Sequence, residues 1–178
     1  DGSDGGVGTM PLGELQIEGI YPLAYIRMLA NSTVKRVFAR TSSHFHQANV
    51  DNDVDDLATV SLEMDSGCVG SLSLGRIGAA SHPDIGEIKL HLLGSKGSLV
   101  ISEARPEVAL YARDQPPAEF KHQRIADENN YLLMQNFANA MDVDCEPILN
   151  ASGARDIAAT VHAALESARS GNAVEPIR

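Results

Sequence analysis

Alternating apolar and polar side chains predict two β-hairpins in this chain. Between 58 and 64 the even positions are apolar and the odd positions are Thr59, Ser61 and Glu63, and after the turn sequence DSG the alternation resumes with Leu72 and Leu74. A second alternating stretch begins at 88, turns at GSKG and returns as SLVISE. Side chains that alternate with a period of two lie on opposite faces of a strand. Further strands are expected at 33–46, before the first hairpin, and in EVALYA, after the second.

Three other stretches are expected to be helices. The first spans 20–30, with Pro22 tolerated in its first turn, and is apolar enough to be buried on most sides. The second begins near Asp127 and carries an inward stripe. The third runs from about 152 to 168 and stops at Gly171. Residues 113–126, between the last predicted strand and the second predicted helix, are expected to form an exposed loop. The stripe residues expected to face inward are Leu133, Met134, Phe137, Ala138 and Met141 in the second helix, and Ile157, Val161, Ala164 and Leu165 in the third.

Consecutive strands bracketed by helices, without βαβ alternation, predict an α+β fold. We expect a largely antiparallel, open-faced β-sheet with helices packed on one face. The other face carries Ser, Thr and Lys beside apolar residues and is expected to serve oligomerisation. The 178 residues are long enough for one compact domain spanning 1–178.

Composition narrows the class of protein. A net charge of −10 disfavours binding to nucleic acid or anionic lipid. No run of about 18 apolar residues and no leader-like segment is recognised, so a cytoplasmic protein without a membrane span is expected. Cys68 and Cys145 lie in unrelated contexts and are interpreted as buried thiols. The sequons at Asn31 and Asn150 are interpreted as the end of one helix and the start of another.

Common catalytic and ligand-binding motifs are absent from the sequence. It has no glycine fingerprint between a strand and a helix, no phosphate loop and no Gly-x-Ser-x-Gly elbow. Asp51, Asp53 and Asp55 have the first spacings of a calcium loop, but the later positions lack its glycine and bidentate glutamate, so an acidic lead-in to a strand is favoured. His44 and His46 lie on one side of a predicted strand without a third ligand, so no metal site is expected.

Four segments taken together resemble the C-terminal domain of the Gfo/Idh/MocA family, the relatives of glucose-fructose oxidoreductase and inositol dehydrogenase. They are GELQIEGIYPLAYIRML, VDDLATVSLEMDSGCVGSLSLG, KLHLLGSKGSLVI and AALESARSGNAVE, in this order. The resemblance implies a second domain that binds a sugar or polyol and packs sheet to sheet in homo-oligomers. It also implies an N-terminal Rossmann domain with NAD or NADP and a catalytic Lys upstream of Asp1, so no cofactor is expected in this chain itself.

The resemblance places the candidate site at the start of the chain. The family pattern Gly-x-Leu-x-Asp-x-Gly-x-His/Tyr matches at Gly13, Leu15, Gly19 and Tyr21, which gives Tyr21 the substrate-facing position and a possible acid/base role. Ile17 stands where the family has its acid and cannot exchange a proton. Glu18 lies one residue after the position of the family acid and is a further candidate for substrate binding. Residues four apart on a helix share a face, so Ile17 and Tyr21 are expected to line one wall, with Tyr25 as a packing residue.

The substitution at Ile17 leaves three functions open. The first is the substrate-binding and oligomerisation domain of an NAD(P)-dependent oxidoreductase that acts on a sugar, polyol or related carbohydrate, inactive without its coenzyme half. The second is a ligand sensor that has lost its chemistry, and the third is a dimerisation module. Arg76 and His91 are expected at an interface or a cleft rim and no more.

Overall fold

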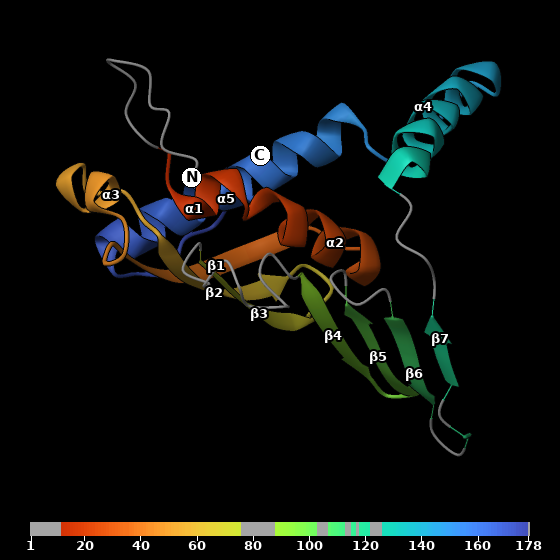
Figure 1. Ribbon diagram of the computed structural model, residues 1–178, viewed down its shortest axis with the longest axis horizontal. Helices are drawn as coiled ribbons and strands as arrows, with labels where there is room; N and C mark the ends of the chain where they lie inside the picture. Colours follow the sequence, from red (N-terminus) through yellow and green to blue (C-terminus); the bar gives the residue numbers. More distant parts are fainter. Residues whose placement is uncertain are drawn as a thin grey trace. The chain divides into compact units, whose positions relative to one another are not determined.

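The computed structural model describes residues 12–75, 88–102, 107–112, 115–116, 118–121 and 126–177. The chain divides into two compact units, Asp1–Ile77 with Leu149–Arg178, and Gly78–Ile148. Within the described residues, one unit contains a three-stranded sheet and the other a four-stranded sheet, and all strand pairs are antiparallel (Figure 1). These sheets and their helices confirm the predicted α+β class.

The first unit is built on the predicted hairpin. Its sheet has the order β1-β2-β3, formed by β1 (Val34–Ser42), β2 (Leu57–Met64) and β3 (Val69–Gly75). In the β2–β3 register, Val60 lies opposite Leu72, so the apolar positions of both strands share a face. Gly67 has a φ of 84° in the connecting turn, where a residue without Cβ adopts the left-handed conformation at low cost.

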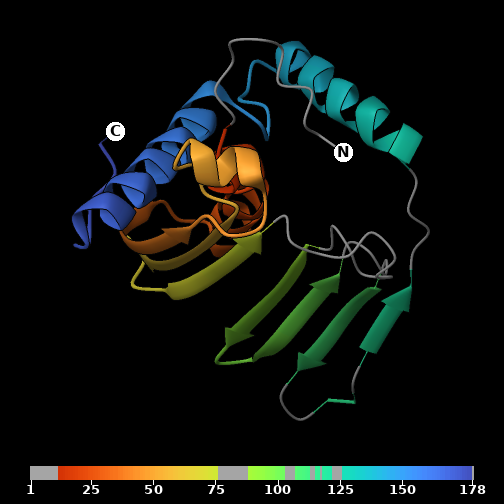
Figure 2. The ribbon, with the colours of Figure 1, turned by 60° about the vertical axis from the view of Figure 1, so that its left-hand side comes forward.

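One face of this sheet carries the core of the unit. The helices α1 (Glu14–Ile17), α2 (Ile20–Ala30) and α5 (Ala151–Ser170) lie on the same side of the three strands, as Figures 1 and 2 both show. Leu15, Val37 and Val60 are almost fully buried between these layers. Within this unit, no described helix covers the opposite face, as predicted for an open-faced sheet.

Helix α5 has strong sequence signals at both ends. The side chain of Asn150 accepts a hydrogen bond from Gly153 N at 2.7 Å, which satisfies a free N–H of the first turn. Gly171 ends the helix with a φ of 74°. Beyond it, Val174 pairs with Val37, so the C-terminal tail covers the outer edge of β1. Inward-facing Val161 and Ala164 are buried as predicted.

Helix α2 has the predicted limits but not the predicted burial. Its buried residues are Pro22 and Leu23, whereas Tyr21, Tyr25 and Met28 are exposed. The prediction of a helix buried on most sides was therefore wrong. Because α2 contacts the unit through one face, an apolar composition all round leaves its other face uncovered.

The second unit is a meander of β4 (Lys89–Gly94), β5 (Gly97–Ser102), β6 (Glu107–Ala112) and β7 (Ala118–Lys121), followed by α4 (Ala126–Asp142). The second predicted hairpin is β4–β5 and is confirmed. The expected loop at 113–126 was wrong in part, because β7 lies inside it and pairs with β6.

The inward stripe predicted for α4 was also wrong. Leu133, Met134, Phe137, Ala138 and Met141 are exposed, and among the α4 side chains that the structure describes the buried one is Ala140. Periodicity identifies the apolar face of a helix but cannot show that another element covers it. Among the described parts of the chain, no element makes extensive contact with α4.

Two smaller expectations have different outcomes. Cys68 and Cys145 are exposed, not buried, because Cys68 follows the β2–β3 turn and Cys145 follows α4. Asn31 ends α2 in the left-handed conformation, and Asn150 caps α5, so both sequons lie at helix boundaries as predicted.

The short helix α3 (Gln47–Asp51) was not predicted from the sequence. None of the described helices combines the length and apolar character needed to cross a membrane.

Candidate functional site

The segment that carries the candidate site folds as two helices joined by a sharp turn. Gly13 precedes α1, and its carbonyl accepts hydrogen bonds from Gln16 N and Ile17 N. Gly19 lies between α1 and α2, and a Cβ at this position would lie 2.9 Å from Leu15 Cδ1 and nearer still to the Leu15 carbonyl oxygen. The glycine therefore permits the close approach of the two helices.

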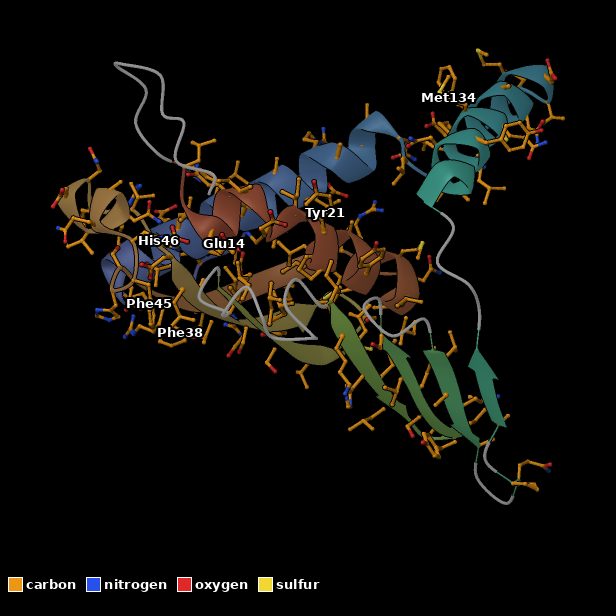
Figure 3. The ribbon with its side chains drawn as sticks, viewed as in Figure 1. Glu14, Tyr21, Phe38, Phe45, His46 and Met134 are labelled. Atoms are coloured by element: carbon orange, nitrogen blue, oxygen red, sulfur yellow. The ribbon has the colours of Figure 1, made fainter. Side chains whose placement is uncertain are left out.

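Tyr21 lies in the first turn of α2 with half of its surface exposed. Figure 3 labels Tyr21 on α2. Tyr25 and Met28 follow at helical spacing, so these three exposed side chains form one stripe, which we call the α2 stripe. A half-exposed tyrosine offers both a ring face and a hydroxyl to a ligand.

Ile17 and Glu18 lie just before this stripe. Ile17 is the last residue of α1, Glu18 caps its C-terminus, and both are half-buried. Since α1 ends before α2 begins, Ile17 and Tyr21 do not belong to one continuous helix. The helical spacing therefore does not determine whether they share a wall, and this remains a prediction.

Two consecutive aspartates just before β2 accept hydrogen bonds from the backbone of two different segments. The Asp55 carboxylate accepts a hydrogen bond from Leu15 N at 2.9 Å, and the Asp55 carbonyl accepts one from Glu14 N at 2.9 Å. The fully buried Asp56 carboxylate accepts from the backbone N–H groups of residues 44, 45 and 46. Neither role was predicted from the sequence.

The pKa of Asp56 reflects this environment. Burial alone would raise the pKa of the carboxyl group, but the hydrogen bonds from Phe45, His44 and His46 outweigh burial and lower it from 3.8. Asp56 is therefore ionised at neutral pH. In the sequence, the available signal was that two aspartates lead directly into a buried strand, where their carboxylates need N–H partners.

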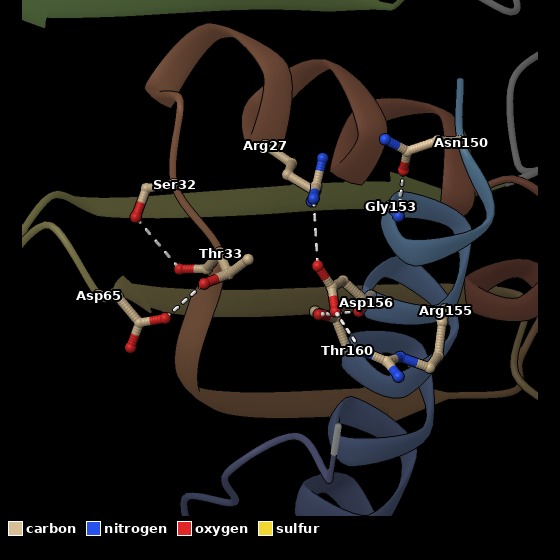
Figure 4. Close-up of polar contacts among 9 residues, drawn as sticks. All are labelled: Arg27, Ser32, Thr33, Asp65, Asn150, Gly153, Arg155, Asp156 and Thr160. Carbon is tan, nitrogen blue, oxygen red and sulfur yellow. Dashed lines mark hydrogen bonds and ion pairs between the residues drawn. The ribbon is translucent and has the colours of Figure 1, made fainter. Parts of the chain in front are cut away.

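An ion pair joins α2 to α5 behind the stripe. Arg27 Nη2 lies 3.1 Å from Asp156 Oδ2, and Asp156 is largely buried (Figure 4). A Cβ at Gly153 would lie 3.1 Å from Arg27 Nη1, so this glycine leaves room for the guanidinium. The pair fixes α2 against the first turns of α5.

The open face of the three-stranded sheet carries mostly polar side chains, together with the exposed apolar residues Phe38 and Val69. Phe38 lies opposite Ser61, which lies opposite Ser71, and the guanidinium of Arg40 lies 4.8 Å from the Phe38 ring centroid. Nearby, hydrogen bonds from Arg36 and Lys35 lower the pKa of Glu63. This open face thus has few free charges despite its basic strand.

Metal ligands do not gather in the part of the chain that the structure describes, where no group of three or more His, Cys, Asp or Glu side chains is arranged to hold an ion. His44 and His46 were expected on a strand, but they lie in the loop between β1 and α3. They lie there because the Asp56 carboxylate accepts hydrogen bonds from the backbone of this loop. His91 lies exposed on β4, and Arg76 lies outside the described residues.

Comparison with known proteins places these features in context. A family profile described as the GFO/IDH/MocA C-terminal domain matches residues 12–100, half of the chain. The comparison with curated protein sequences found no match.

Solved structures with similar folds share low sequence identity. An oxidoreductase from Agrobacterium radiobacter in complex with NAD+, L-tartaric acid and magnesium matches with a TM-score of 0.78 and 18% identity over 93% of this chain and 51% of that one. A levoglucosan dehydrogenase in complex with NADH matches with a TM-score of 0.78 and 19% identity over 94% and 51%. An aldose-aldose oxidoreductase from Caulobacter crescentus, complexed with glycerol, matches with a TM-score of 0.70 and 22% identity over 92% and 48%. The chain thus spans about half the length of each.

Proposed function

The chain belongs to the GFO/IDH/MocA C-terminal domain family, and from this membership we propose that it is the substrate-binding and oligomerisation domain of an NAD(P)-dependent oxidoreductase. The proposed substrate is a sugar, polyol or related carbohydrate. Two of the similar structures are of enzymes whose names refer to carbohydrates, which supports this class. We propose that one family-type domain covers 1–178 and that a Rossmann domain precedes it in the full-length protein.

The position of Tyr21 carries the proposal. The family pattern assigns this residue to the substrate, and its side chain is half exposed at the start of α2. A hydroxyl on a helix that is held by Arg27 and Asp156 can meet a substrate hydroxyl without a movement of the helix backbone. We assign Tyr21 to substrate binding and to proton exchange with the substrate, with Ile17 and Glu18 beside it.

The coenzyme does not fit the described residues of this chain. A dinucleotide cradle forms where a parallel strand leads through a glycine-rich turn into a helix. The described strands pair antiparallel, and the sequence lacks the glycine fingerprint. We therefore propose that NAD or NADP binds the Rossmann domain of the full-length protein.

We propose the open face of β1–β3 as the oligomerisation surface. The Phe38–Ser61–Ser71 row and the neighbouring Arg40 present an aromatic ring and short hydroxyl side chains without a covering helix. Short side chains allow two flat sheets to approach closely. Light scattering on the full-length protein should give the mass of a dimer or a larger assembly. Phe38→Glu should reduce the mass of this assembly, because the glutamate charge would be buried between the two sheets.

Steady-state kinetics of the full-length protein test the enzymatic part of the proposal. NAD+ or NADP+ reduction is followed with a panel of aldoses, polyols and sugar acids. Tyr21→Phe removes one hydroxyl and should lower kcat/KM about tenfold or more, as expected for a lost hydrogen bond or proton exchange. Tyr131→Phe, which alters an exposed tyrosine of α4, is the matched control and should change kcat/KM by less than about twofold. Equal values for both variants would contradict the role of Tyr21.

A ligand sensor is the second candidate, favoured by the aliphatic, half-buried Ile17 at the position of the family acid. A sensor would bind a carbohydrate in calorimetry without reducing the coenzyme. If Ile17→Asp then produced turnover, loss of the acid would explain the inactivity. Turnover by the natural protein would exclude the sensor, whereas absence of both binding and turnover would favour a dimerisation module.

A further inference from the structure

Asp55 makes two contacts with the beginning of α1, forty residues earlier in the chain. Its side-chain Oδ2 accepts from Leu15 N, and its carbonyl accepts from Glu14 N, each at 2.9 Å. The first N–H groups of a helix have no partner within the helix. Since Gly13 at the N-cap has no side chain to serve them, Asp55 supplies that cap from a different element.

The same contact explains the glycine at 13. A Cβ added to Gly13 would lie 2.7 Å from Asp55 Cγ and still closer to Oδ1. The backbone of Gly13 has a φ of −69° and a ψ of 156°, which any residue adopts. The obstacle to a side chain at 13 is therefore the Asp55 carboxylate itself and not the backbone conformation.

Contacts between α1 and α2 link the position of α1, which Asp55 holds, to the position of the α2 stripe. Leu15 is fully buried, and Gly19 closes against its carbonyl oxygen. Leu23 N in turn donates to the Gly19 carbonyl, which continues the packing into α2. Tyr21 lies between these two points, so a shift of α1 moves the start of α2.

We propose that Asp55 is the positioning residue of the candidate substrate wall: through Leu15 and Glu14 it holds α1 so that Tyr21 meets the substrate. This inference rests on the proposed function, because it concerns the same wall. Asp55 does not touch the substrate. Its effect is exerted through the backbone of α1.

A double-mutant cycle in the full-length protein tests the contact without any substrate. Asp55→Ala and Gly13→Ala should each lower Tm by about 5 °C, because both break the hydrogen bond to Leu15 N. Once the carboxylate is removed, the added methyl at 13 has room. The double variant should therefore lose no more than either single variant, whereas additive losses would overturn the inference.

Kinetics then separate positioning from general stability. Asp55→Ala should raise KM for the carbohydrate about tenfold, since a displacement of the wall weakens orientation, while coenzyme affinity stays unchanged. Asp55→Asn keeps an oxygen that can accept from Leu15 N and should recover most of this loss. Asp56→Ala is the matched control, because this neighbouring buried aspartate ties down 44–46 instead of α1. It should lower Tm at least as much as Asp55→Ala does, with KM within about twofold of the natural protein.

Each outcome gives a clear answer. A KM that changes equally in the Asp55→Ala and Asp56→Ala variants would reduce Asp55 to a stabilising residue and overturn its positioning role. Absence of carbohydrate turnover by the natural full-length protein would overturn the proposed function, and the positioning role with it. The coupling between Gly13 and Asp55 would still be measurable then, so the two failures are distinguishable.

Discussion

Replacing Asp56 by Ala should remove the hydrogen bonds that hold the loop preceding α3. In the native protein the carboxylate receives three backbone N–H groups, from His44 at 2.9 Å, Phe45 at 2.7 Å and His46 at 3.2 Å. A methyl group accepts none of them. The three donors then have to find water or remain unpaired.

The structure bounds the cost of this change. A buried donor without a partner costs about 1–3 kcal/mol. Because the Phe45 side chain is exposed, water can reach the opened loop, and the lower end applies, about 1 kcal/mol for each donor. The free energy of unfolding should fall by about 3 kcal/mol, which corresponds to a Tm lower by about 6–12 °C for a chain of this size.

Acid should remove the difference between Asp56 and its amide variant. The folded-state pKa of Asp56 lies below its ordinary value of 3.8, so the ionised carboxylate stabilises the fold above that value, and the contribution is lost as pH falls through the folded pKa. The Tm difference between the natural protein and Asp56→Asn should therefore be constant from neutral pH to about pH 5 and shrink below about pH 4.

Thermal unfolding followed by circular dichroism measures both effects, and hydrogen exchange at the amides of 44–46 reports the loop directly. Asp51→Asn, at an exposed aspartate in α3, is the control and should change Tm by less than about 2 °C. An Asp56→Ala variant with unchanged Tm and unchanged exchange at 44–46 would refute the reasoning. So would an Asp56→Asn difference that persists undiminished into acid.

Three further substitutions test the packing and caps of the first unit. Leu15→Ala removes a fully buried side chain and should lower the free energy of unfolding by about 3 kcal/mol in denaturant titrations; a loss below about 1 kcal/mol would contradict its place in the core. Gly171→Ala forces a Cβ into a φ of 74° and should cost about 1 kcal/mol by the same titration, with an unchanged value as the contrary result. Arg27→Met leaves Asp156 without its 3.1 Å partner and should cost about 1–3 kcal/mol, whereas a neutral or stabilising effect would show that the pair does not hold α2 to α5.

Local patterns in the sequence were sufficient for elements whose residues interact with near neighbours. The hairpin of β2 and β3 follows from alternation and the turn at Gly67, and the limits of α5 follow from Asn150 and Gly171. Each signal depends on positions a few residues apart. The resemblance to the family likewise drew on short segments, and the family match supports it.

Features that depend on distant partners could not be predicted. Nothing near Asp55 in the sequence indicates that it caps a helix at Leu15, and the acidic run around it was interpreted as a lead-in to a strand. For the same reason, α2 was expected to be buried on most sides and the apolar stripe of α4 to face inward, although the apolar positions of a helix do not show whether a partner covers them. The role of Tyr21 remains a proposal from the family pattern.

A crystal structure of the full-length protein with coenzyme and carbohydrate tests the central claim most directly. It measures where the Tyr21 hydroxyl lies relative to the substrate and the nicotinamide ring. We predict that this hydroxyl lies within hydrogen-bond distance of a substrate hydroxyl. A carbohydrate bound at another surface, with Tyr21 facing away from it, would contradict the account.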